Sequence, residues 1–150
     1  MSKRVEVPFS TTLLVRDTCL CLHVQRAARA LARRFDEALR PLALTHGQFS
    51  LLNALNRDAP AQIPAVSSLL GMDRTTLTAA LKPLERRRLV IVTMDPDDGR
   101  SRRVALSASG KRLLASAVPV WRRTHEQLEA GLPPGAPKRL RSGLDTLAAL

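Results

Sequence analysis

The chain has 150 residues, of which 45% are hydrophobic and 25% are charged. These values suit one packed domain and exclude an intrinsically disordered chain. Lys and Arg number 24 against 13 Asp and Glu, a formal net charge of +11, which favours a polyanionic partner such as nucleic acid. Only 3% of the residues are aromatic, so we expect a core of Leu, Val and Ala in packed helices.

Membrane insertion and export are not indicated by the sequence. No apolar run approaches the roughly 18 residues of a membrane span. The first fifteen residues, MSKRVEVPFSTTLLV, lack the apolar core and cleavage site of a signal peptide. Cys19 and Cys21 are too few for a disulfide framework. We therefore expect a cytoplasmic protein with no membrane partner.

Two long helical segments are predicted near the ends of the chain. The first begins at a cap at Asp17 or Thr18, ends just before Pro41 and carries one apolar stripe. A terminal amphipathic helix of this length often packs against a partner chain. Ser107 caps another long helix that reaches about residue 130, and Pro119 is expected to kink it. A last helix follows the break GLPPGAP and carries leucines on one face.

The middle of the chain predicts a helix-turn-helix. Thr45 and Gln48 have the spacing of a capping box, so a helix starts there and runs to about residue 57. IPAVSSLLG predicts a short helix that ends at Gly71, and Asp73 then caps the helix RTTLTAALKPLERRR. Two helices joined by a tight turn are the helix-turn-helix arrangement.

Two strands follow this pair of helices. LVIV and RRVAL read as strands, with a turn at Asp98-Gly99 between them. A hairpin after a helix-turn-helix makes a winged helix. Residues 74–112 contain ten basic and four acidic side chains, which is +6 of the total net charge of +11. This concentration favours a DNA-binding hairpin over a charged hairpin without a function.

The helix after Asp73 divides into two faces. Leu77, Leu81 and Leu84 are spaced for the core. The opposite face combines short hydroxyls with basic side chains, which suits base edges and phosphates in a major groove. The alternative is a solvated face whose threonines have no role. The predicted DNA-binding residues of this helix are Arg74, Thr75, Thr76, Thr78 and Lys82.

The string DPDDGRSRRVALSASG, residues 95–110, resembles the wing of the multiple antibiotic resistance regulator (MarR) family. The family pattern is roughly Asp-Pro-x-Asp-x-Arg-x-x-x-Val-x-Leu-Thr-x-x-Gly. MDRTTLTAALKPLERRRLV is similar to the family's recognition helix, and the resemblance covers about residues 17–150. The matching wing residues are Asp95, Pro96, Asp98, Arg100, Val104, Leu106 and Gly110, with Ser107 in place of Thr.

The resemblance implies a mainly α-helical fold with a small β-hairpin wing, as one MarR-like domain over residues 1–150. Residues 45–106 would form a winged helix-turn-helix DNA-binding lobe, and residues 17–44 and 107–150 a helical dimerisation region. It further implies a homodimeric repressor on a pseudo-palindromic double-stranded DNA operator, with Arg100 of the wing in a minor groove. Arg102 and Arg103 are also expected to bind DNA, but neighbours on a strand point to opposite faces, so which one does so stays open.

Two residues depart from the family pattern. Arg88 stands where the family usually has Gly, so the helix must end in another way and with some strain. Pro83 lies inside the recognition helix and removes one backbone hydrogen bond. Base contacts by the arginines that follow Pro83 are therefore not expected, and phosphate or structural roles are.

The cysteines suggest one type of regulatory input. Cys21 falls where the organic hydroperoxide regulators of the family carry their reactive cysteine, although the tyrosines that hold that cysteine are absent here. If both cysteines lie on one helix, Cys19 and Cys21 are about 200° apart around it and cannot bond to each other without unwinding. A disulfide between chains is an alternative. Another is that Cys21 is a small buried hydrophobe.

A small ligand is the other type of input. The family more often binds a small aromatic acid or phenol, and His23 or Arg26 could pair with its carboxylate. The histidines do not cluster with the cysteines, so no metal site is predicted. No cofactor motif or catalytic constellation occurs, and an enzyme is not expected. A sequence-tolerant architectural DNA-binding protein is the remaining alternative.

Overall fold

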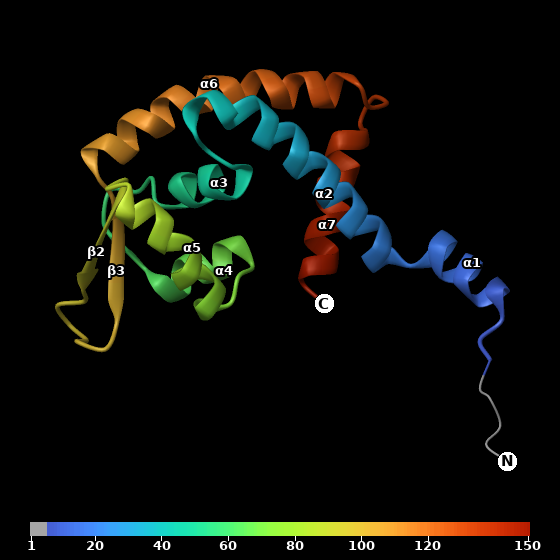
Figure 1. Ribbon diagram of the computed structural model, residues 1–150, viewed down its shortest axis with the longest axis horizontal. Helices are drawn as coiled ribbons and strands as arrows, with labels where there is room; N and C mark the ends of the chain where they lie inside the picture. Colours follow the sequence, from blue (N-terminus) through green and yellow to red (C-terminus); the bar gives the residue numbers. More distant parts are fainter. Residues whose placement is uncertain (1–5) are drawn as a thin grey trace, which may run out of the picture.

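A computed structural model describes residues 6–150 and confirms the predicted class, a mainly helical chain with a small antiparallel sheet (Figure 1). Residues 1–5 lie outside the described residues. They begin the fifteen-residue segment that lacks the features of a signal peptide. The elements are α1 (Phe9–Thr18), α2 (Leu20–Leu39), the 3-10 helix η1 (Arg40–Leu42), α3 (His46–Ala54), β1 (Ala61–Gln62), α4 (Ile63–Leu70), α5 (Arg74–Arg86), β2 (Val90–Met94), β3 (Arg102–Leu106), α6 (Ala108–Ala130) and α7 (Ala136–Ala148).

Helices α3, α4 and α5 and the sheet form one lobe, from which α2 and α6 extend packed against each other (Figure 1). The core of this lobe continues into α6, where Leu114 and Ala117 are buried. The rings of Phe49 and Trp121, with centroids 6.0 Å apart, stack between α3 and α6. The core of the lobe is therefore completed by the long helix α6.

The first predicted helix is α2, which begins at Leu20, so its expected cap is wrong, and an unpredicted helix, α1, precedes it. Cys19 has an extended backbone, with ψ 107°, and separates α1 from α2. The N-cap of α2 is Cys19, whose Sγ accepts the Leu22 N–H at 3.5 Å, in place of Asp17 or Thr18. Helix α1 was not predicted because its sequence, FSTTLLVRDT, is rich in β-branched residues and has no separate apolar stripe. None of its residues is buried.

The other helix starts follow the predicted caps. Thr45 Oγ1 accepts the Gln48 N–H at 3.2 Å, and the Gln48 side chain accepts the Thr45 N–H at 3.1 Å. Asp73 and Ser107 cap α5 and α6 in the same way. Gly71 ends α4 in the left-handed region, at φ 62°. These contacts lie within three residues along the chain, which explains why the sequence reveals them.

The sheet has a third strand that the sequence did not predict. Its order is β1-β3-β2, with Val104 of β3 paired to Ala61 on one side and Val92 on the other. Strand β1 has only two residues, and the sequence around it predicts a loop. The predicted turn at Asp98-Gly99 is a longer loop over 95–101, and Gly99 does not have the positive φ of a two-residue hairpin turn.

Arg88, which stands where the family usually has Gly, follows the end of α5 and has a strained backbone, as predicted. Its φ is 57°, in the left-handed region, where a non-glycine residue is disfavoured by about 1 kcal/mol. The hydroxyls of Ser107 and Ser109 both donate to the Arg88 carbonyl, at 2.7 and 2.8 Å. These two hydrogen bonds offset the strain and tie the end of α5 to the start of α6.

Helix α6 runs without interruption through Pro119, which lies on its exposed side, and arches over the lobe (Figure 1). A proline on the solvent side leaves the freed carbonyl accessible to water, which makes its presence tolerable. Among residues 6–150, no helix combines the length and the hydropathy that crossing a bilayer requires.

Candidate nucleic-acid interface

Helix α5 is held by a cap at one end and by leucines along one face. Asp73 accepts the Thr76 N–H and the Thr76 hydroxyl, each at 2.7 Å, and these bonds hold the pKa of the Asp73 carboxyl below its usual value. Leu77, Leu81 and Leu84 are buried, as predicted. The rotation of α5 about its axis is therefore fixed by the core, and its other face is turned outward.

The outward face carries four of the five predicted side chains together. Thr76 lies off this group because its hydroxyl is bound to Asp73 in the cap. The others surround a shallow hollow of about 300 Å³ on the exposed side of the helix. Short threonines beside longer basic side chains leave room for a base edge to approach. The residues that line this hollow are Arg74, Thr75, Thr78, Ala79 and Lys82.

Past Pro83, the arginine that follows α5 has a structural partner. The helix continues to Arg86, so Pro83 does not end it. Arg87 Nη1 donates to the Ala43 carbonyl at 2.7 Å and so links the end of α5 to the segment before α3. This structural role of Arg87 agrees with the expectation that residues after the proline do not read bases.

The tip of the wing is shaped by Asp98. Its carboxylate accepts the Arg100 N–H at 3.0 Å and the Ser101 hydroxyl at 2.9 Å, and its carbonyl accepts the Ser101 N–H at 2.9 Å. Asp98 thus orients Arg100 through the backbone of that residue. Within the described chain, the Arg100 guanidinium has no carboxylate within ion-pair distance, so it is available to an external anion.

The base of the wing is organised around Asp95, which is 3% exposed. Arg103 Nε lies 2.9 Å from Asp95 Oδ2, and Gln62 Nε2 donates to the same oxygen at 3.1 Å. The Asp97 N–H donates to Asp95 Oδ1 at 3.0 Å. The Arg103 guanidinium first, and then the Asp97 N–H, lower the pKa of the Asp95 carboxyl to about 2.

The two neighbouring arginines of β3 have different surroundings. The Arg103 side chain is 27% exposed and also lies 3.2 Å from Asp97. Arg102 is exposed, and its guanidinium makes only long hydrogen bonds, of 3.4 Å, to the carbonyls of Gly99 and Ser101. The geometry therefore favours Arg102 as the one that faces DNA, and contact of Arg103 with DNA stays a prediction. The role of Gln62 was not predicted, because it is 33 residues from Asp95 in sequence.

The sequence suggested that both cysteines lie within one helix, but the structure places only Cys21 in a helix. Cys19 is half-buried at the break between α1 and α2, and Cys21 lies in the first turn of α2. Both thiols are free, and Gln25 Nε2 donates to Cys21 Sγ at 3.2 Å. Cys21 is exposed in the single chain, so the chain's own core does not bury it as a small hydrophobe.

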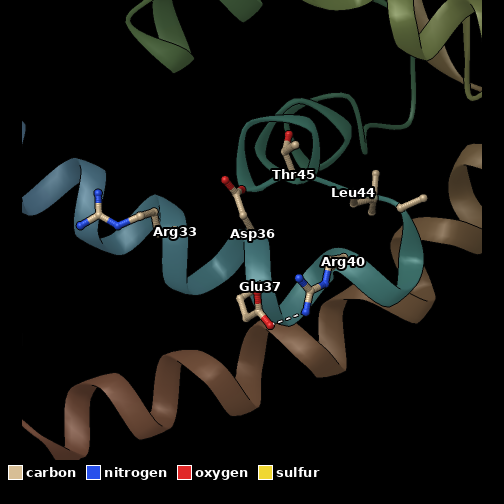
Figure 2. A pocket seen from close by; sticks show the side chains of 7 residues that line it. Arg33, Asp36, Glu37, Arg40, Leu44 and Thr45 are labelled. Carbon is tan, nitrogen blue, oxygen red and sulfur yellow. Dashed lines mark hydrogen bonds and ion pairs between the residues drawn. The ribbon is translucent and has the colours of Figure 1, made fainter.

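Helix α2 carries two hollows of similar size. One, of about 490 Å³, is lined by His23, Arg26, Ala27, Arg29, Ala30 and Arg33, with no acidic side chain. The other, of about 520 Å³, is lined by Arg33, Asp36, Glu37, Arg40, Ala43, Leu44 and Thr45 (Figure 2). In the second hollow Glu37 is paired with Arg40, and Asp36 accepts the His46 N–H at 2.6 Å.

The charges of these two hollows favour different contents. In the first hollow the arginines lie beside His23 without a carboxylate in the lining, which favours an anion. In the second the carboxylates already offset the arginines. His23 and Arg26, predicted together as ligand residues, lie in the hollow that suits a carboxylate. No three His, Cys, Asp or Glu side chains gather as metal ligands within 6–150.

Comparison with known proteins places this geometry among transcription regulators. The sequence model of the MarR family matches residues 43–101, from the end of η1 to the wing loop. SarZ of Staphylococcus epidermidis, a helix-turn-helix transcriptional regulator, is 27% identical over 92 residues. That match covers 61% of this chain and 62% of SarZ, so the chain spans about three fifths of the length of this relative.

Solved structures match over a larger part of the chain. The M. tuberculosis transcriptional regulator MosR in complex with DNA superposes with a TM-score of 0.80 at 34% identity, over 88% of this chain and 95% of MosR. A transcriptional repressor named CouR, bound to a 23-mer DNA duplex, has a TM-score of 0.75 at 29% identity, over 95% and 99% of the two chains. With its winged helix and the basic outward face of α5, the chain belongs to the MarR family of transcription regulators.

Proposed function

We propose that the chain is a homodimeric, sequence-specific DNA-binding repressor that recognises a pseudo-palindromic operator. The observation that carries this proposal is the hollow on α5, where two threonines and two basic side chains face outward from a helix fixed by buried leucines. A patch of positive charge alone would bind any nucleic acid. Sequence-specific binding also requires side chains such as threonines, held at fixed positions where they can contact base edges.

Each side chain of the interface has a distinct role in this proposal. Thr75 and Thr78 contact base edges and thymine methyl groups, and Arg74 forks onto a guanine. Lys82 and Arg102 neutralise phosphates and supply affinity that does not depend on sequence. Arg100 enters the flanking minor groove, where a narrow A·T-rich groove attracts a guanidinium.

The homodimer is supported by apolar side chains at the far end of the molecule. Leu20, Val24 and Leu31 of α2 are exposed, as are leucines along α7. A second copy would cover both faces at once. Two recognition helices would then address half-sites one turn of DNA apart, roughly 34–36 Å.

Release from DNA by a small aromatic or phenolic acid is the proposed regulation. CouR of Rhodococcus jostii RHA1, which shares the fold, is bound to p-coumaroyl-CoA in its solved structure, and this ligand contains a phenolic acyl group. In this chain the hollow of His23 and Arg26 would accept the anionic group of an effector. An effector that prefers a dimer whose lobe spacing does not fit the operator lowers the affinity for DNA by shifting the population.

The operator proposal is tested by Thr75→Ala combined with Thr78→Ala, in gel shifts on the DNA upstream of the protein's own gene. We expect a loss of about 2 kcal/mol or more, roughly 30-fold, on the operator and almost none on unrelated DNA. Lys82→Ala is the matched control, because a lost phosphate contact weakens binding to all sequences and reduces the salt dependence.

Two results would contradict base reading by α5. If the unmodified protein shows no sequence preference at any salt concentration, no operator exists. If the double variant loses affinity equally on every sequence, the chain is an architectural protein that binds DNA through its charge and without sequence preference.

Redox sensing is a second candidate regulation, favoured by the exposure of Cys21 and by the helix break at Cys19. An oxidised Cys21 would alter the junction of α1 and α2 and so the dimer. We expect the Cys21 thiol of the native protein to react with an alkylating reagent about as fast as a free thiol, and operator binding to fall after peroxide treatment. A thiol that stays unmodified in the native dimer excludes this regulation.

A further inference from the structure

Asp95 is the point at which the three strands of the wing meet. It follows β2 directly, and its side chain contacts one residue from each of the other two strands, Gln62 of β1 and Arg103 of β3. Gln62 and Arg103 are also cross-strand neighbours in the sheet. The carboxylate therefore bridges the whole width of the sheet from one end.

This carboxylate is fully engaged despite its burial. Burying a charged group is unfavourable unless its hydrogen-bonding capacity is met and a counter-charge lies close by. Here one oxygen accepts the Asp97 N–H, and the other meets both Gln62 and Arg103. Because the pKa of Asp95 is about 2, the group is ionised and the bridge is complete throughout the neutral pH range.

From Asp95 the constraint extends to the wing tip. The Asp95 N–H donates to the Ser101 carbonyl at 3.0 Å and closes the loop. Inside the loop, Asp98 holds the backbone of Arg100 and Ser101. Contacts of Asp95 and Asp98 thus hold the backbone of the loop on both sides of the tip, up to the N–H of Arg100. Without the Asp95 carboxylate, the loop would keep the ladder between β2 and β3 and the exposed contact of Asp97 with Arg103, but it would lose its buried link to β1.

We propose that Asp95 is a positioning residue for DNA binding, which through Arg103 and Gln62 fixes the wing so that Arg100 meets the minor groove beside each half-site. This inference rests on the proposed function, because it assigns the wing a contact with operator DNA. Arg103 then acts on DNA only through Asp95. Asp95 and Arg103 together therefore influence recognition of the sequences that flank the half-sites, rather than of the half-sites themselves.

The sign of the effect separates positioning from simple charge. If Asp95 were only a negative charge near the DNA, neutralising it would strengthen binding to every sequence. If it positions the wing, neutralising it weakens binding, although the net charge becomes more positive. In Asp95→Asn the amide oxygen can still accept a hydrogen bond, either from Gln62 or from the Asp97 N–H. The amide NH2 group, however, replaces the second oxygen and cannot accept a hydrogen bond from the remaining donors.

The test compares two duplexes with the same half-sites, one with A·T-rich and one with G·C-rich flanks. The unmodified full-length chain should prefer the A·T-rich flanks, because a narrow minor groove attracts Arg100. Asp95→Asn and Arg103→Gln should each lose roughly tenfold in affinity on those flanks and little on the others. The double variant should lose no more than either single variant, since both remove one contact. Arg102→Gln is the matched control and should weaken binding to both duplexes equally.

Amide hydrogen exchange reports on the same contact without DNA. Asp95→Asn should make the amides of Asp97 and Ser101 exchange roughly tenfold faster, while amides of α3 and α6 keep their protection. Arg102→Gln should leave these rates unchanged. If the wing amides of Asp95→Asn exchange as in the unmodified chain, or if its DNA affinity rises, Asp95 does not position the wing. Absence of any sequence preference in the unmodified chain would instead contradict the proposed function, and the exchange rates would still decide the role of Asp95.

Discussion

Gly110→Ala is expected to destabilise the folded chain by about 3 kcal/mol or more, at the upper end of overpacking changes. Gly110 is buried in the first turn of α6, where that helix crosses the start of β2. A Cβ at this position would lie 2.0 Å from the Leu89 carbonyl oxygen and 3.0 Å from its carbon. Both atoms belong to backbone, and the Leu89 oxygen also accepts the Ser107 N–H at 3.0 Å. Neither side can move without breaking the cap of α6.

Urea unfolding followed by circular dichroism measures this change, and the midpoint of thermal unfolding should fall by roughly 10 °C. Gly47→Ala is the matched control. A Cβ there meets only Thr45 Oγ1 at 3.9 Å, in the exposed first turn of α3. It should stabilise the chain by a few tenths of a kcal/mol to about 1 kcal/mol through helix propensity. A Gly110→Ala chain as stable as the control would show that α6 can shift away from β2.

The parts of this fold that the sequence predicts are those governed by short-range contacts. Helix caps at Thr45, Asp73 and Ser107 join atoms three residues apart, so the motif and the contact are the same observation. The outward face of α5 follows from the helical period, since burying Leu77, Leu81 and Leu84 leaves only one orientation for the threonines. Both predictions succeed because the geometry of one helix is sufficient to make them.

The parts that the sequence does not predict depend on contacts between distant segments. Strand β1 exists because it pairs with β3, about forty residues later, and two residues have no strand pattern of their own. Likewise, alternation along β3 shows that Arg102 and Arg103 face opposite ways, but only the buried Asp95 shows which one is engaged. Helix α1, which ends just before Cys19, is not predicted because its sequence has no apolar stripe and none of its residues is buried.

Leu144→Glu is expected to dissociate the proposed homodimer while leaving the DNA-binding lobe folded. Leu140, Leu144 and Leu147 are 53%, 47% and 39% exposed and line an apolar groove of about 410 Å³ on α7. No residue of α7 is buried within its own chain, so the substitution removes nothing from the lobe core. In a dimer the same carboxylate would be desolvated without a partner, which is unfavourable by several kcal/mol.

Operator binding by Leu144→Glu should fall roughly 10²- to 10⁴-fold, because a single lobe loses the effective concentration that the second half-site supplies. Sedimentation equilibrium measures the mass, and a gel shift on the operator measures the affinity. Leu69→Glu is the matched control for assembly, because Leu69 is 60% exposed on α4 and should leave the dimer intact. The unmodified chain sedimenting as a monomer, or Leu144→Glu remaining a dimer, would contradict this interface. Loss of the dimer with full operator affinity would instead show that one lobe suffices, and the pseudo-palindromic operator would then have no structural basis.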